Sequence, residues 1–338
     1  MQQRDLERRD LKRRDLLRLA GGAAAYAALG APAVAQGGWP QKEKTVKVIV
    51  PFPPGAANDA LGRLLAERLQ AKFGCTAIVE NRVGGAGLIG TKAVIQAEPD
   101  GYTLLASAFN TAVMPIVLKA ADFDPEVDLE VVARTAVAPL VCVMTASRAE
   151  KTLTEVVAAA NADPAKWSFA ISSLGSAGHL ATIDLLRRTG AKIAMVPYRG
   201  TQPALQDIMA GAVQLLIDPT FALLPATKDS TRARALGIAT AKRSVLAPDI
   251  PTMAEVGLPG FEFNSWYGVW APKGTPKEIQ LTLNTLLQDT MRDPAVNKRL
   301  TATLIEPVAE SIDASKAFIR SEIVRAGELL KSVNFQPA

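Results

Sequence analysis

The residues best suited to chemistry lie in a loop between an apolar run at 46–50 and a segment at 59–72 in which leucines recur at helical spacing. The first turn of a helix leaves backbone N–H groups without partners and carries the positive end of the helix dipole. This loop can therefore bind a carboxylate or a phosphate without a lysine, and we expect Asn58 to be the helix N-cap. The candidate ligand contacts here are Phe52, Gly55, Ala56, Ala57 and Asn58.

A second loop of the same kind follows an apolar run at 76–80 and leads into an expected helix at 88–97. Loops at the carboxyl ends of neighbouring parallel strands lie on the same edge of a sheet. We therefore expect the two loops to face one ligand, and a third strand at 103–107 adds Ser107 and Asn110. The second loop contributes Gly84, Gly85, Ala86 and Gly87.

The middle of the chain also places polar residues where apolar runs end. His179 is expected either to cap a helix or to hydrogen-bond a ligand oxygen. Asp218 either contacts a donor on the ligand or caps a turn, and Arg199 either pairs with a second carboxylate or points into solvent. The candidates in this part of the chain are Ser173, Ser176, His179, Arg199 and Asp218.

Two better-known site patterns lack a residue that their chemistry requires, and a third is absent from the sequence. The glycines from Gly85 to Gly90 have dinucleotide-binding spacing, but the next strand does not end in the required acid. Thr91 and Lys92 stand in the reverse order of a phosphate-binding loop. The chain also lacks the Gly-x-Ser-x-Gly pattern of a hydrolase. These departures argue against nucleotide binding and against Ser/His hydrolysis.

Two cysteines and one histidine are too few for a transition-metal centre, so we expect no metal and no other cofactor. Cys75 and Cys142 either form a disulfide or remain two separate buried thiols. Trp266, Tyr267 and Trp270 form an aromatic group that we expect to pack in the core.

Residues 1–35 have the features of an export signal. Basic residues around Arg13 and Arg14 precede a mildly apolar stretch and a small-residue cleavage site that ends at Ala35. The paired arginines predict twin-arginine export to the periplasm. Removing the signal takes seven Lys or Arg and four Asp or Glu from totals of 38 and 33, which leaves a net charge of +2. This balance argues against nucleic-acid binding.

Apolar runs alternate with helical patterns along the rest of the chain, which predicts an α/β fold with mainly parallel sheets. The expected strands lie near 46–50, 76–80, 103–107, 140–145, 167–172, 193–197, 213–217 and 235–239. The expected helices lie near 59–72, 88–97, 151–161, 178–189, 202–210, 276–292 and 313–332.

Seven runs of the sequence resemble the Bug family, the periplasmic substrate receptors of tripartite tricarboxylate transporters. They are IVPFPPG at 49–55, VENR at 79–82, PDGYTLL at 99–105, VPYRG at 196–200, RAL at 234–236, PTMAEVG at 251–257 and APKGTP at 271–276. The sequence departs from the family in its first loop, where Gly55, Ala56, Ala57 and Asn58 stand in place of three glycines and a threonine.

This resemblance implies a type II periplasmic-binding fold, in which two lobes close on a ligand cleft about two crossover segments. We expect residues 41–140 and 265–338 to form the first lobe and residues 141–264 the second, with crossings near 139–145 and 261–269. The implied function is non-catalytic capture of a small organic carboxylate by a monomer that delivers it to membrane permease subunits. The alternatives are an exported enzyme acting on a small acid and the ligand-sensing subunit of a signalling system.

Overall fold

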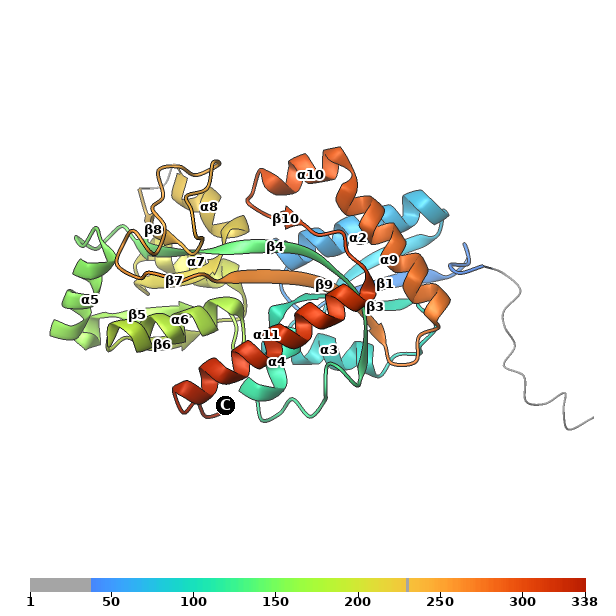
Figure 1. Ribbon diagram of the computed structural model, residues 1–338, viewed down its shortest axis with the longest axis horizontal. Coiled ribbons are helices and arrows are strands. Elements are labelled where there is room, and N and C mark those ends of the chain that lie inside the picture. Colours follow the sequence, from blue (N-terminus) through green and yellow to red (C-terminus); the bar gives the residue numbers. More distant parts are fainter. Residues whose placement is uncertain (1–37, 229–230) are drawn as a thin grey trace, which may run out of the picture. The chain divides into compact units, whose positions relative to one another are not determined.

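The computed structural model describes residues 38–228 and 231–338 (Figure 1). The predicted signal peptide at 1–35, with its twin arginines and its cleavage site, lies outside the described residues. Among the described residues, no helix is both long and apolar enough to cross a membrane.

The first lobe is built on three parallel strands whose carboxyl ends lead into helices. The strands, in sheet order, are β2 (Thr76–Asn81), β1 (Thr45–Val50) and β3 (Thr103–Ala108). The elements that follow them are α2 (Ala57–Phe73), η1 (Gly85–Gly87), α3 (Leu88–Ile95) and α4 (Phe109–Val117). The carboxyl-end loops therefore lie on one edge of the sheet, as expected for parallel strands.

The C-terminal part of the chain returns to pair with β3 and β4. Strand β9 (Asn264–Pro272) pairs antiparallel with β3, and the short strand β10 (Glu306–Pro307) pairs with the long strand β4 (Leu129–Thr145). The helices of this part are α9 (Lys277–Arg292), α10 (Pro294–Thr301) and α11 (Ile312–Ser332).

The second lobe repeats the arrangement with its own strands. Parallel pairing joins β6 (Ala194–Pro197) to β5 (Ser168–Ile171), and β5 to β7 (Leu215–Pro219). Strand β8 (Ala233–Ile238) runs antiparallel to β4. The other elements are α5 (Leu153–Ala162), η2 (Pro164–Lys166), α6 (Ala177–Thr189), α7 (Thr201–Ala210) and α8 (Thr220–Lys228).

Strand β4 links the two lobes. It is 17 residues long and lies beside β9 across the middle of Figure 1. Its residues up to Pro139 pair with β9, whereas those from Leu140 pair with β7 and β8. The Leu140 N–H also donates to the carbonyl oxygen of Phe263, just before β9, at 3.2 Å. Strands β4 and β9 run antiparallel to each other. The sheets therefore combine parallel and antiparallel pairs, whereas the sequence pattern predicted mainly parallel sheets.

The core explains the apolar patterns. On α2 the buried residues include Leu61, Leu64, Leu65 and Leu69, as their helical spacing predicts. Cys75 and Cys142 are separate buried thiols, which is one of the two expected outcomes. Burial raises the pKa of the Cys142 thiol to about 12.

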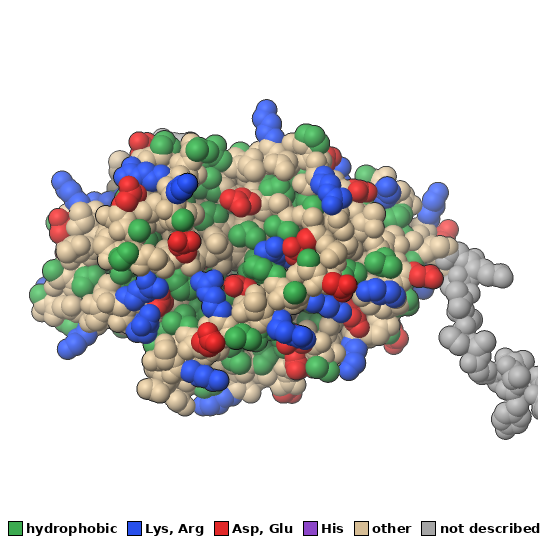
Figure 2. Space-filling model, in the orientation of Figure 1, with side chains coloured by type: hydrophobic (Ala, Val, Ile, Leu, Met, Phe, Trp, Pro, Cys, Tyr) green, Lys and Arg blue, Asp and Glu red, His purple; other side chains and the backbone are tan. Residues whose placement is uncertain are grey.

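On the face shown in Figure 2, Lys and Arg side chains are interspersed with Asp and Glu.

Candidate ligand-binding site

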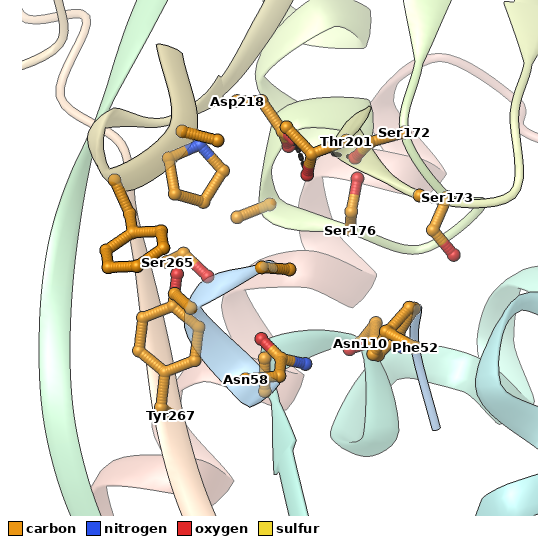
Figure 3. Close-up of a pocket in the computed structure, with 18 of the residues that line it drawn as sticks. Phe52, Asn58, Asn110, Ser172, Ser173, Ser176, Thr201, Asp218, Ser265 and Tyr267 are labelled. Carbon is orange, nitrogen blue, oxygen red and sulfur yellow. Dashed lines mark hydrogen bonds between the residues drawn. The ribbon is translucent and has the colours of Figure 1, made fainter. Parts of the chain in front are cut away.

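A cavity of about 70 Å³ lies between the lobes, and we call it the inner cavity (Figure 3). Loops at the ends of β1, β3, β5, β6 and β7 line it, together with Ser265 and Tyr267 of β9. Parallel strands thus bring residues far apart in the sequence to one place, as the sequence analysis expected.

Five helices begin at the inner cavity. Their first residues are Ala57 of α2, Phe109 of α4, Ala177 of α6, Thr201 of α7 and Thr220 of α8. For α2, α4 and α7, no side chain caps the helix start by a hydrogen bond. Backbone N–H groups at these starts carry partial positive charge and are suited to binding an anion.

Asn58 reaches the cavity from within α2 rather than from its cap. The N-cap is Ala56, which has extended φ and ψ angles of −87° and 168°, so the expectation that Asn58 caps the helix is wrong. As the second residue of the helix, Asn58 is buried and its side chain projects into the inner cavity (Figure 3). Its amide is available there as both donor and acceptor.

Asp59 holds the first loop in shape, and sequence reasoning missed it. Its carboxylate accepts hydrogen bonds from the Gly55 N–H at 3.2 Å, from Asn81 at 3.0 Å and from Arg63 at 2.9 Å. Burial by itself raises the pKa of Asp59, but the hydrogen bonds from Arg63, Asn81 and Gly55 outweigh it and hold that pKa below its ordinary value. An acid in a first helical turn with an arginine four residues later was the available signal.

The glycine-rich second loop lines a neighbouring space, which we call the outer cavity. This cavity has a volume of about 280 Å³, and Gly84, Gly85, Ala86, Gly87 and Arg199 are among the residues that line it. The loop forms η1, with positive φ from Gly84 to Gly87, Ala86 included at 55°. Such angles favour glycine and tolerate Ala86 at some cost.

Phe52 separates the two cavities. Phe52, Ser173 and Gly200 line both of them. Two hydrogen bonds reach the carbonyl oxygen of Ala86, one from the Asn110 amide at 3.1 Å and one from the Ser173 hydroxyl at 3.5 Å. The two predicted loops therefore lie next to each other but face adjoining cavities, and Asn110 of α4 holds the second loop.

The remaining predicted residue of the first lobe lies beneath the surface of the inner cavity. Ser107 lies beside a separate small space, and its hydroxyl accepts a hydrogen bond from the Thr111 hydroxyl at 2.7 Å.

Ser176 and His179 form the start of α6. Ser176 is the N-cap and lines the inner cavity, and its hydroxyl accepts from the His179 N–H at 3.1 Å. The His179 ring is buried, stacks edge-on against Phe335, and accepts at Nδ1 from the Gly175 N–H at 3.1 Å. Burial lowers the pKa of His179 to about 4, so the ring is neutral near pH 7. The side chain supports the serine loop and lines neither cavity.

Asp218 lies at the second-lobe end of the inner cavity and is 1% exposed. Its carboxylate accepts from the Ser172 hydroxyl at 2.8 Å and from the Thr201 hydroxyl at 2.5 Å. Burial raises the pKa of Asp218 to about 6, against the effect of these two bonds. Sequence reasoning missed Ser172, the last residue of the predicted strand at 167–172, and Thr201, which lies four residues after the predicted strand at 193–197.

The aromatic group on β9 divides between the core and the cavity. Trp266 and Trp270 are buried with ring centroids 6.0 Å apart, as expected. Tyr267 is buried as well, yet its ring lines the inner cavity. Side chains alternate between the faces of a strand, and this places Tyr267 opposite its neighbours. Burial, together with the Asp218 charge, raises the pKa of the Tyr267 hydroxyl despite a hydrogen bond with Ser265.

Among the described residues, no three His, Cys, Asp or Glu side chains are grouped in a way that could hold a metal ion.

The sequence of this chain is similar to a known receptor family. A family model described as the tripartite tricarboxylate transporter family receptor matches residues 61–335. The chain is 37% identical over 284 residues to protein BugT of Bordetella pertussis, covering 83% of this chain and 87% of BugT.

Two solved structures share the fold. Rpa4515 of R. palustris with adipate has a TM-score of 0.84 at 32% identity, and MatC of Rhodopseudomonas palustris with bound malate has a TM-score of 0.80 at 27% identity. The matches cover 89% and 86% of this chain and the whole of each structure. These likenesses confirm the predicted two-lobed α/β binding-protein fold.

Proposed function

Since the chain belongs to the receptor family of tripartite tricarboxylate transporters, we propose that it binds a small organic carboxylate in the periplasm and delivers it to the permease subunits of such a transporter. The observation that carries this proposal is that helix N-termini converge on one cavity between two lobes and that the starts of α2 and α4 have no side-chain cap. Hydrogen bonds to a charged acceptor contribute about 1.5–3 kcal/mol each, roughly twice the neutral value. A site built from backbone N–H groups can therefore hold a carboxylate without a lysine.

The ligand carboxylate is placed between the lobes, with donors from the starts of α2 and α4 and from the amide of Asn58. Ser173 and Ser176 approach from the second lobe, and Asp218 meets the far end of the ligand. The segment Gly84–Gly87 and Arg199 meet any part of the ligand that extends past Phe52 into the outer cavity. Ser107, Asn110 and His179 act by holding these loops. The relatives Rpa4515 and MatC, solved with adipate and malate, support a carboxylate as ligand.

Closure of the lobes completes the site. We assign residues 41–140 and 265–338 to the first lobe and 141–264 to the second, with the hinge where β4 changes partners at Pro139 and Leu140. Contacts across the cleft support a closing motion: the Ser173 hydroxyl, which also lies 3.3 Å from the Leu174 carbonyl oxygen, is 3.5 Å from the Ala86 carbonyl oxygen, and Gly200 approaches Pro53.

The proposed receptor has no catalytic step and acts as a monomer. The Ser176 hydroxyl accepts from a backbone N–H, and the His179 ring accepts from another, so the two side chains are not arranged as nucleophile and base. We also propose that residues 1–35 direct twin-arginine export and are removed after Ala35.

A thermal-shift screen tests the proposal. The purified protein is heated with mono-, di- and tricarboxylates, aromatic acids and amino acids, with a neutral sugar and a nucleotide as controls. An acid at one hundred times its dissociation constant adds about 2.7 kcal/mol to the free energy of unfolding and raises the melting temperature. A panel of acids that leaves the melting temperature unchanged, while a control raises it, would refute the proposal.

A further inference from the structure

Ser172, Thr201 and Asp218 form a cluster at the second-lobe end of the inner cavity, which we call the acceptor corner (Figure 3). Ser172 follows β5, Thr201 begins α7 and Asp218 lies in β7, so three separate elements build it. The two hydroxyls donate to different oxygens of the carboxylate.

The chemistry of the acceptor corner follows from its hydrogens. A hydroxyl has one hydrogen to donate and lone pairs to accept with. Ser172 and Thr201 have both committed their hydrogen to Asp218, so they offer only lone pairs to the cavity. An ionised carboxylate likewise offers only lone pairs. The corner can therefore satisfy a donor on the ligand but not another carboxylate.

Asp218 is held in this role by its surroundings. The starts of α6 and α7 adjoin it and favour a negative charge there. At Gly178 of α6, an added Cβ would lie 3.1 Å from Asp218 Oδ1, so the helix approaches the carboxylate closely. The other titratable group facing Asp218 is the Tyr267 hydroxyl. With a pKa of about 6, Asp218 is mainly ionised near pH 7.

Ser176 lies beside the acceptor corner with a different capacity (Figure 3). Its hydroxyl oxygen accepts from the His179 N–H, so its hydrogen can be given to a second acceptor. A ligand hydroxyl can donate to the corner and accept from Ser176 at the same time. An ammonium group can only donate.

We propose that the acceptor corner and Ser176 select carboxylates that bear a hydroxyl group over plain acids of the same length. This inference rests on the proposed function and specifies its substrate class. A plain methylene group in this position leaves buried acceptors without partners when the cleft closes, and that loss is expected to weaken binding by about 10- to 100-fold.

Matched pairs of ligands test the inference by titration calorimetry at pH 7.5. The pairs are malate with succinate and lactate with propionate, and aspartate and alanine supply the corresponding amino acids. In each series we expect the hydroxy acid to bind at least 10-fold more tightly than the plain acid, and the amino acid shows whether the corner prefers an ammonium group to a hydroxyl. These measurements use the unaltered protein, so they decide the inference whether or not a variant folds.

Asp218→Asn tests the residues. The asparagine amide brings a donor into the corner, so we expect the preference for the hydroxy acid to fall below about 3-fold. Asp207→Asn is the matched control, because Asp207 is on α7, accepts from the Tyr198 hydroxyl at 2.7 Å and lines neither cavity. The control should keep the preference of the unaltered protein.

The outcomes separate the two proposals. Equal binding of hydroxy and plain acids would overturn the inference and leave the proposed function standing, and so would an unchanged preference in a folded Asp218→Asn protein. Tighter binding of the amino acids would overturn the role of Ser176. If none of these acids binds although another acid raises the melting temperature in the thermal-shift screen, only the inference is overturned; if no acid of that screen binds either, the proposed function itself fails.

Discussion

At the scale of single residues, Asn58 shows how a site can be predicted while its geometry is not. The loop after β1 was identified because a short polar residue follows an apolar strand and precedes a helix. The exact helix start could not be predicted, because Ala56 occupies the cap without offering a side-chain acceptor. The helix therefore begins earlier and turns Asn58 into the inner cavity.

Asn58→Asp is expected to weaken carboxylate binding by about 10- to 100-fold, because it replaces a donor with a second acid. Titration calorimetry with the tightest acid from the thermal screen measures the change. Asn297→Asp is the control, since it adds the same charge at an exposed position of α10. Unchanged affinity in the Asn58 variant would remove this residue from the site.

Because the His179 ring is buried, we expect the free energy of unfolding to depend on pH. Its pKa is about 4 in the folded protein, below the ordinary value of 6.5, because burial disfavours the charged ring. The folded state therefore binds fewer protons than the unfolded state, and stability from the neutral ring, present above pH 6.5, is lost as the pH falls towards 4. The loss amounts to about 3 kcal/mol across that window.

Urea unfolding at pH 7 and at pH 4.5 measures this loss, and His179→Gln supplies the comparison. Other acids titrate in both proteins, so the difference between their pH dependences isolates the histidine. Parallel pH profiles would show that His179 is protonated freely in the folded state.

At the scale of elements, the strands that end at the cavity were predictable and several others were not. Apolar runs identified β1, β2, β3, β5, β6, β7, β8 and the second part of β4, and the loops expected after these strands include Ser176 and Asp218, which line the inner cavity. Helices α4 and α8 were missed because Pro115 and Pro225 interrupt their patterns. Helix α10 begins with Asp293 as N-cap and Pro294, a signal that was available.

Strand β9 was missed for a different reason. Its aromatic residues were read as core, because large rings bury much area wherever they pack. Whether a given ring faces the core or a cleft depends on which face of the strand meets the second lobe, and one chain segment alone does not contain that information. Tyr267 and Ser265 were therefore beyond prediction from local pattern.

Gly178 lets the start of α6 approach β7 closely, because it has no side chain. An added Cβ would overlap the carbonyl oxygen of Ile217, so Gly178→Ala must push the helix start away from the strand. We expect the free energy of unfolding to fall by about 1–3 kcal/mol, together with weaker ligand binding. Thermal and urea unfolding measure the effect.

Gly327→Ala is the matched control, because it lies in α11 with open space around an added Cβ. Alanine has the higher helix propensity, so stability should stay the same or rise by up to about 1 kcal/mol. Equal stability of the two variants would show that the contact between α6 and β7 has room to relax.

At the scale of the whole molecule, the resemblance to a family supplied what the sequence pattern could not. Strand ends predicted loops on one edge of each sheet, but they did not predict how the strands of the two lobes are joined. That arrangement depends on β4, which changes its partners from β9 to β7 and β8 within one strand. The apolar pattern predicts a strand only at 140–145, which is the second part of β4.

The chain order of β4 and β9 also sets the order in which the strands of the two lobes become available during synthesis. Every strand of the second lobe, β4 to β8, has been synthesised before β9 emerges, whereas the first lobe still lacks the strand that lies between β3 and β4. The nascent chain can therefore complete its middle while its beginning waits, with the edge of β3 unpaired, for residues after 264. Under the twin-arginine export that we propose, this last pairing must be complete before the protein leaves the cytoplasm.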